Sequence, residues 1–264
     1  MRKFFFIDYD NTIFSHYSHS IPRGAAEALL KLQKAGHKVI LSSGRGLSDE
    51  LLPDLPENFK PDGLVGANGA IVVIDGQKIW ENPMNEELKN RLIDYVQEKD
   101  YLLVTSAEDE FYVSSLKHYE ASRFRETEPQ VPRGDADFDL LRSKPVFSFF
   151  MNESLEIIEA TQNHFPDLRL FYMGDELGGA DVIPAENGKV KGVERVLTHY
   201  GAGFQDAAAI GDSMNDLEMI QAAGIGIAMG NAMPEVKKAA DYVAKHIDDG
   251  GLADAIAYAL DFFS

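Results

Sequence analysis

The sequence predicts an α/β fold in which a parallel-sheet core carries an inserted α+β domain. Phe4–Ile7 is an unbroken apolar run, which is typical of a strand buried on both faces. A helix and a second apolar strand follow it, and together they form a βαβ unit. After a middle segment with a different pattern, the alternation of strands and helices returns near residue 186. We therefore expect a core made from both ends of the chain.

The N-terminal part of the chain supplies the first βαβ unit and a hairpin. Pro22 and Gly36 mark the start and stop of a helix with apolar residues at helical spacing, and Lys38–Ser42 is the second buried strand. Asn68-Gly69 and Asp75-Gly76 predict the tight turns of the following strands. These strands are expected at Gly63–Ala67, Ala70–Ile74 and Gln77–Trp80.

The middle of the chain predicts mixed strands and helices, and the last part returns to the α/β pattern. Middle helices are expected from about Asn85, near His118 and at Ser154–His164, with strands at Tyr101–Thr105, Phe111–Val113, Pro145–Met151, Leu168–Met173 and Ala180–Ile183. The last elements are helices at Lys191–Tyr200, Asp216–Ala223, Pro234–Ala239 and Leu252–Phe262, with strands at Ala207–Ile210, Gly224–Ala228 and Tyr242–Ala244. We assign residues 1–83 and 185–264 to the core and residues 84–184 to the insertion.

Composition excludes several classes of partner. The formal net charge of −18 opposes binding to polyanions, and no run of Lys and Arg offsets it, so we expect neither nucleic acid nor anionic membrane as a partner. The apolar run after Arg2-Lys3 is too short for a secretion signal, and no stretch reaches the roughly 20 apolar residues that a membrane span needs. The absence of cysteine is compatible with the cytoplasm, which is the expected location.

Asp8 and Asp10 directly follow the first apolar strand. In an open α/β sheet, ligands bind at the carboxyl ends of the strands. Two carboxylates this close raise one another's pKa unless a cation lies between them. The pair therefore indicates either a metal site or a division of labour between a nucleophile and an acid–base group. The alternative is a strand that ends in a solvated acidic turn.

Two further segments end at the same expected sheet edge. Ser43 and Gly44 follow the second strand, where a hydroxyl and a backbone amide can bind phosphate, although Ser-Gly is also ordinary turn chemistry. Lys191 opens a predicted helix, and a cation at the positive end of the helix dipole indicates an anionic partner. The alternatives are a solvated Lys191 and Lys189 as the functional lysine.

The segment Gly211–Asp216 is the most specific of these signals. An apolar strand ends in Gly-Asp, so Asp212 would reach a cation and Asp216 would orient its surroundings. Helix capping by Ser213 with Asp216 in the first turn is the alternative. Capping leaves Asp212 and Asn215 unexplained.

These segments resemble the motifs of a known family. Asp8–Thr12, Ser43–Arg45, Lys191-Gly192 and Gly211–Asp216 occur in the order and spacing of the haloacid dehalogenase superfamily. Over nearly its whole length the chain is similar to the Cof-type sugar phosphatases of that superfamily. The resemblance implies a Rossmann-like core and a cap at residues 84–184 that closes over the site and selects the substrate.

The resemblance also implies roles for single residues. Asp8 is the implied nucleophile, which forms an aspartyl-phosphate, and Asp10 is the implied acid and base. For this role Asp10 must hold a proton while Asp8 stays ionised, which a cation near Asp8 and a drier setting for Asp10 would arrange. The implied cofactor is Mg²⁺, and its implied ligands are the Asp8 carboxylate, the backbone carbonyl of Asp10 and the Asp212 carboxylate, with Asp216 in the outer shell. The implied phosphate-binding groups are Ser43, Gly44, Lys191 and Asn215.

Three positions depart from the usual family pattern. Tyr9 and Asn11 stand where Leu and Gly are common, and Ser43 replaces the commoner Thr. The Tyr9 side chain is expected to point away from Asp8 and Asp10. Asn tolerates a left-handed backbone, so we expect the turn at Asn11 to keep its shape.

The sequence thus predicts a Mg²⁺-dependent phosphatase that hydrolyses small phosphorylated metabolites, with sugar phosphates as the leading class. One alternative is a phosphomutase or phosphotransferase on the same core. A second alternative is a catalytically silent regulatory protein that binds phosphate.

Overall fold

The chain forms two compact units. The computed structural model describes residues 2–46, 55–56, 58–107, 110–122, 124–127, 134–174 and 178–264. Met1–Glu81 and Gly188–Ser264 form the core unit, and Asn82–Asn187 form the inserted unit. The predicted α/β class with a parallel-sheet core is confirmed.

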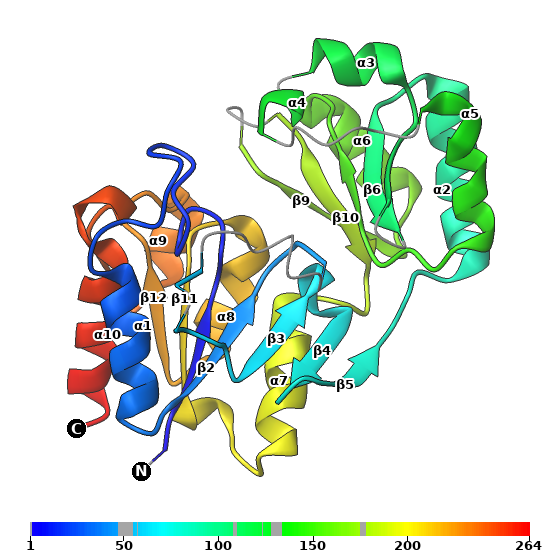
Figure 1. Ribbon diagram of the computed structural model, residues 1–264. Helices are drawn as coiled ribbons and strands as arrows, with labels where there is room; N and C mark the ends of the chain where they lie inside the picture. The colour runs from blue at the N-terminus through cyan, green and yellow to red at the C-terminus, as the bar shows by residue number, and fades with distance from the viewer. Residues whose placement is uncertain are drawn as a thin grey trace. The chain divides into compact units, whose positions relative to one another are not determined.

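The core unit is built on an eight-stranded sheet (Figure 1). Its strands are β1 (Phe4–Ile7), β2 (Lys38–Ser42), β3 (Gly63–Gly66), β4 (Ile71–Ile74), β5 (Gln77–Glu81), β11 (Ala207–Gly211), β12 (Ile225–Ala228) and β13 (Tyr242–Val243). Their order is β13-β12-β11-β1-β2-β3-β4-β5. The strands from β13 to β3 are parallel, and β4 and β5 add an antiparallel hairpin at one edge.

Two groups of helices cover the core sheet (Figure 1). The helices are α1 (Ala25–Lys34), α7 (Lys189–His199), α8 (Leu217–Ala222), α9 (Pro234–Ala239) and α10 (Gly251–Phe262). Helix α1 contacts α10, and α8 contacts both α7 and α9. None of the described helices is both long and apolar enough to cross a membrane.

The position of β1 explains where the site forms. All four residues of β1 are buried, as expected for a central strand with helices on both faces. Ile7 lies level with Leu41 of β2 on one side and with Ile210 of β11 on the other. Because the three strands are parallel, the residues that follow them come together at one edge of the sheet.

The inserted unit has a five-stranded antiparallel sheet of its own, in the order β7-β6-β8-β10-β9. Its strands are β6 (Leu103–Ala107), β7 (Glu110–Val113), β8 (Phe149–Met151), β9 (Leu168–Tyr172) and β10 (Ala180–Pro184). Its helices are α2 (Glu86–Lys99), α3 (Leu116–Ala121), α4 (Phe124–Thr127), α5 (Asp135–Phe138) and α6 (Leu155–His164). A separate apolar core, which includes Leu92, Tyr112 and Phe149, fills this unit.

The strand predicted at Pro145–Met151 is shorter than expected. Only Phe149–Met151 pairs as a strand, in β8. Pro145 has no amide hydrogen to give to a ladder, and the carbonyl of Val146 accepts the amide of Met84 instead. The apolar run therefore overestimated the length of the strand.

Candidate active site

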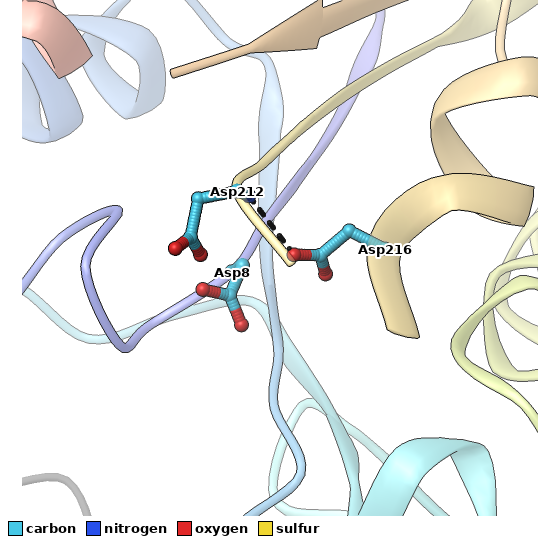
Figure 2. Close-up of side chains that lie close together, drawn as sticks. All are labelled: Asp8, Asp212 and Asp216. Carbon is cyan, nitrogen blue, oxygen red and sulfur yellow. Dashed lines mark hydrogen bonds between the residues drawn. The ribbon is translucent and has the colours of Figure 1, made fainter. Parts of the chain in front are cut away.

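Three buried carboxylates gather at the carboxyl ends of β1 and β11. Asp8 follows β1, and Asp212 and Asp216 follow β11. Figure 2 shows the three side chains close together, and one oxygen from each lies within 4.8 Å of the others. They are 4%, 7% and 0% exposed. Buried carboxylates at this spacing need compensating positive charge.

The sequence around Gly211 lets Asp216 approach the sheet edge. A Cβ atom on Gly211 would lie 2.4 Å from Cγ of Asp216, so this position has no room for a larger residue. Oδ2 of Asp216 accepts the backbone amide of Asp212 at 3.0 Å, as Figure 2 shows, and also that of Ser213 at 3.0 Å. Ser213 and Asp216 thus form a capping box, as the capping alternative supposed, but the other oxygen of Asp216 has a different partner.

That partner is Lys189, a fully buried lysine. Its Nζ lies 2.6 Å from Oδ1 of Asp8 and 2.6 Å from Oδ1 of Asp216. The Lys189 side chain is only 1% exposed. Burial alone would lower its pKa, but the Asp216 and Asp8 carboxylates raise it well above its usual value. Lys189 is thus a permanent positive charge between two of the three acids.

The placement of Lys191 at the site is wrong. Its side chain is 53% exposed, and its Nζ lies 3.5 Å from the Glu194 carboxylate on the same helix. Helix α7 begins at Lys189, two residues earlier than predicted. Lys189 lies on the buried face of α7 with Gly192, Val193 and Val196. The helical spacing of these residues was a usable signal for the buried lysine.

Burial dominates the protonation of Asp8 and Asp212. Removal from water raises the pKa of Asp8, the Lys189 ammonium opposes the rise, and the Asp216 carboxylate adds to it, so that the pKa reaches about 8. Burial and the Asp8 carboxylate together raise the pKa of Asp212 well above its usual value. Another cation beside both groups would keep both ionised at neutral pH.

Asp10 has a different environment from the one expected. Its carboxylate accepts hydrogen bonds from Nε and Nη2 of Arg45 at 2.9 and 2.7 Å, and its Oδ1 lies 2.7 Å from Nε2 of His16. Burial would raise the pKa of Asp10, but His16 and Arg45 outweigh burial and hold that pKa below its usual value. The expected drier setting is absent from this side chain, which is 32% exposed. Without a cation beside Asp8, the pKa of Asp8 is thus raised and that of Asp10 is lowered, whereas the implied roles need the opposite order.

The loop after β1 keeps the expected shape. Asn11 has a φ of 55°, which confirms the left-handed turn. Its side-chain oxygen accepts the amide of His16, which places the His16 ring beside Asp10. Tyr9 is fully buried in the apolar core. Sequence reasoning missed the roles of His16 and Arg45, although an arginine directly after Ser43-Gly44 was a visible signal.

The predicted phosphate-binding groups lie in the loops that follow β2 and β11. Ser43 is buried, its Oγ accepts the amide of Arg45 at 3.1 Å, and Gly44 is half-buried beside it. Asn215 is also buried, and its Nδ2 donates to Oδ1 of Asn68 at 3.0 Å. Because β1 lies between β2 and β11, both loops border the strand that carries Asp8.

The donor set fits a hard divalent cation. Mg²⁺ prefers carboxylate and carbonyl oxygens and takes only one or two carboxylates directly. Both oxygens of Asp216 already accept hydrogen bonds, from Lys189 and from two backbone amides. Asp8 and Asp212 are therefore the carboxylates best placed for direct contact, with Asp216 behind them.

The comparisons with known proteins identify the family. Residues 5–256 match the family model of the haloacid dehalogenase-like hydrolases, and the chain belongs to this family. Relatives of the chain in this family are named phosphatases, which makes the protein a phosphoric monoester hydrolase of the haloacid dehalogenase superfamily.

Relatives and solved structures cover almost the whole chain. YkrA of Bacillus subtilis (strain 168) is 32% identical over 262 residues, which is 96% of each chain. The 5-amino-6-(5-phospho-D-ribitylamino)uracil phosphatase YwtE of the same bacterium is 27% identical over 278 residues, or 94% of each chain. The structure of BT4131, a sugar phosphatase of HAD subclass IIB, matches with a TM-score of 0.87 at 25% identity. That match covers 97% of this chain and 98% of BT4131.

Replacing the buried lysine should be far more costly than replacing its exposed neighbour. Lys189→Met leaves buried carboxylates without their cation, and we expect it to lower the free energy of unfolding by about 3–5 kcal/mol. Lys191→Met, the matched control on the same helix, should stay within about 0.5 kcal/mol of the wild type. Urea unfolding in the presence of a chelator measures the free energy of unfolding of both variants. Similar losses for the two variants would contradict the assignment.

The raised pKa of Asp8 makes the stability of the protein depend on pH. The folded state binds this proton more tightly than the unfolded chain, whose pKa is near 3.8, so the stabilising contribution is full at low pH and is lost as pH rises through about 8. Asp8→Asn cannot titrate. In chelator, the melting temperature of Asp8→Asn minus that of the wild type should therefore increase from about pH 5 to about pH 8. A difference that stays constant or falls would refute the raised pKa.

Proposed function

We propose that the protein is a Mg²⁺-dependent phosphatase of small phosphorylated metabolites and that it acts through an aspartyl-phosphate on Asp8. The observation that supports this most is the buried contact of Asp8 with Lys189, beside Asp212 and Asp216. A carboxylate in this position has a fixed direction and little water around it, and a divalent cation added to Lys189 would hold it ionised. Those are the properties of an activated carboxylate nucleophile.

Asp8 would react in two displacements. In the first, an oxygen of Asp8 forms a bond to phosphorus while the bond between phosphorus and the ester oxygen breaks. In the second, water attacks phosphorus and Asp8 leaves as a carboxylate. Lys189 offsets negative charge at both stages because its ammonium already touches Asp8.

Mg²⁺ would be held by the carboxylates of Asp8 and Asp212 and by the backbone carbonyl of Asp10, with Asp216 in the outer shell. When bound, it supplies positive charge that offsets the carboxylates and the phosphoryl oxygens. The raised pKa values of Asp8 and Asp212 support this proposal, since a cation lowers the cost of ionising both groups.

The phosphoryl oxygens would be bound by Ser43, the Gly44 amide, Asn215 and Lys189. Lys189 takes the role that the resemblance implied for Lys191, because Lys189 contacts Asp8 whereas Lys191 contacts Glu194. Phosphoryl transfer depends mainly on positioning and on charge neutralisation, and these groups offer both.

Asp10 would carry the protons. It donates one to the leaving alkoxide and later removes one from the attacking water. The His16 ring and the ion pair with Arg45 both favour the ionised form of Asp10. We propose that Asp10 exchanges these two partners for the leaving oxygen when the substrate binds, which removes their opposing effect and allows Asp10 to hold a proton.

The inserted unit would choose the leaving group. BT4131 is a sugar phosphatase, and YwtE acts on a phosphorylated ribityl group. Both substrates end in a phosphate on a chain of hydroxyl-bearing carbons. We propose this class for the protein, with sugar phosphates first, and we propose that residues 84–184 act as the cap that recognises it.

Loss of the nucleophile should abolish activity that depends on metal. With para-nitrophenyl phosphate, the wild type should release phosphate only when Mg²⁺ is present. Asp8→Asn should be slower by at least about 1,000-fold, because no other group can take over the covalent step. Asp261→Asn, an exposed control of the same chemistry, should match the wild type. Equal rates for Asp8→Asn and the wild type would overturn the nucleophile assignment.

A substrate panel separates the proposed class from others. We expect a higher kcat/KM for hexose phosphates, pentose phosphates and the phosphorylated ribitylamino compound than for nucleotides or phosphoserine. The reason is that the proposed cap recognises leaving groups that carry several hydroxyls. Preference for nucleotides would contradict the class. Adding free sugars as acceptors and assaying new phosphate esters distinguishes hydrolysis from phosphotransfer, and only free phosphate is expected.

A further inference from the structure

The turn between β3 and β4 is unusual in its backbone. Ala67, Asn68 and Gly69 have φ values of 46°, 52° and 85°, so three consecutive residues are left-handed. We call residues 67–69 the Asn68 turn. Non-glycine residues rarely adopt this conformation, and they keep it only where the surroundings fix it.

The backbone of the Asn68 turn holds the loop that follows β2. The amide of Asn68 donates to the carbonyl of Ser43 at 3.0 Å, and the amide of Ala67 donates to the carbonyl of Arg45 at 2.7 Å. The two bonds flank Gly44. The turn thus fixes the backbone on both sides of an amide that we place on the phosphate.

The side chain of Asn68 holds the loop that follows β11. It is completely buried, and its Oδ1 accepts the hydrogen bond from Nδ2 of Asn215 at 3.0 Å. An asparagine amide can face either way, and an acceptor at this point sets which way Asn215 faces. The nitrogen of Asn215 is thereby directed toward Asn68.

The third residue of the turn packs against the start of helix α7. A Cβ atom on Gly69 would lie 2.1 Å from the carbonyl oxygen of Gly188, the residue before Lys189. The Asn68 turn therefore contacts all three segments that carry the proposed phosphate ligands, namely the loop after β2, the start of α7 and the loop after β11.

We infer that Asn68 is a positioning residue of the phosphate site, which acts by fixing the orientation in which the Asn215 amide meets the phosphoryl group. This inference rests on the proposed function, because Asn215 is the group it acts through. The competing explanation is that Asn68 is present only because asparagine tolerates the left-handed backbone. Glycine tolerates that backbone equally well, so substitution by glycine separates the two explanations.

Asn68→Gly can keep the left-handed backbone of the turn, and it deletes the side-chain bond to Asn215. We expect kcat/KM for para-nitrophenyl phosphate with Mg²⁺ to fall by about 10- to 100-fold. Asp75→Gly is the matched control, because Asp75 is also left-handed, with a φ of 49°, in the next turn along the chain, between β4 and β5. It should retain wild-type activity. Wild-type activity in Asn68→Gly would overturn the inference.

A double-mutant cycle with Asn215→Ala shows whether Asn68 acts through Asn215. If it does, adding Asn68→Gly to Asn215→Ala should change kcat/KM by less than about twofold, since the oriented group is already gone. If the fold-losses of the two single variants instead multiply in the double variant, Asn68 has a general structural role and the inference is overturned. If Asn68→Gly does not fold, Asn68→Ser replaces it in the same double-mutant cycle, because this substitution also removes the amide acceptor.

The proposed function and this inference can fail separately. If Asp8→Asn retains activity, the proposed function fails. If Asp8→Asn is inactive while Asn68→Gly is as active as the wild type, only the role of Asn68 fails.

Discussion

The contact of one buried lysine with two buried aspartates is the constraint on which the site depends. Lys189 lies between Asp8 and Asp216, and Asp212 lies beside them. Three carboxylates cannot be buried together without compensation, because desolvation and mutual repulsion both oppose their ionisation. Lys189 supplies one positive charge. The remaining imbalance is what makes the site suited to a divalent cation and a phosphate ester.

The fold brings these groups together from distant parts of the chain. Asp8 comes from the first strand, and the lysine and the other acids come from the last part, after the inserted unit. Parallel pairing of β1 with β11 makes the two ends neighbours. Small residues then allow the close approach, as Gly211 does for Asp216 and Gly69 does for the start of α7. The proposed catalytic groups therefore all lie in the core unit.

Much of this arrangement could be predicted from the sequence, because short segments of the chain indicate it without reference to distant residues. An apolar run followed by acids predicted β1 and Asp8, and the Gly-Asp step after β11 predicted Asp212. The wrong lysine was chosen because helix starts are uncertain by a residue or two, and Lys189 and Lys191 are separated by that distance. The partners of Asp10 could not be derived in this way. The ion pair with Arg45 spans 35 residues of sequence, and it exists only because β1 and β2 are adjacent.

The central claim is that the cations around Asp8 make it the group that bonds to phosphorus. Borohydride reduction of an acid-quenched reaction with para-nitrophenyl phosphate and Mg²⁺, followed by peptide mass spectrometry, tests this directly, because an acyl phosphate is reduced to an alcohol and a free carboxylate is not. The account predicts homoserine at position 8 in samples quenched during turnover and none without substrate. Phosphate release with position 8 unmodified in every quenched sample, or with the reduced residue elsewhere, would contradict it.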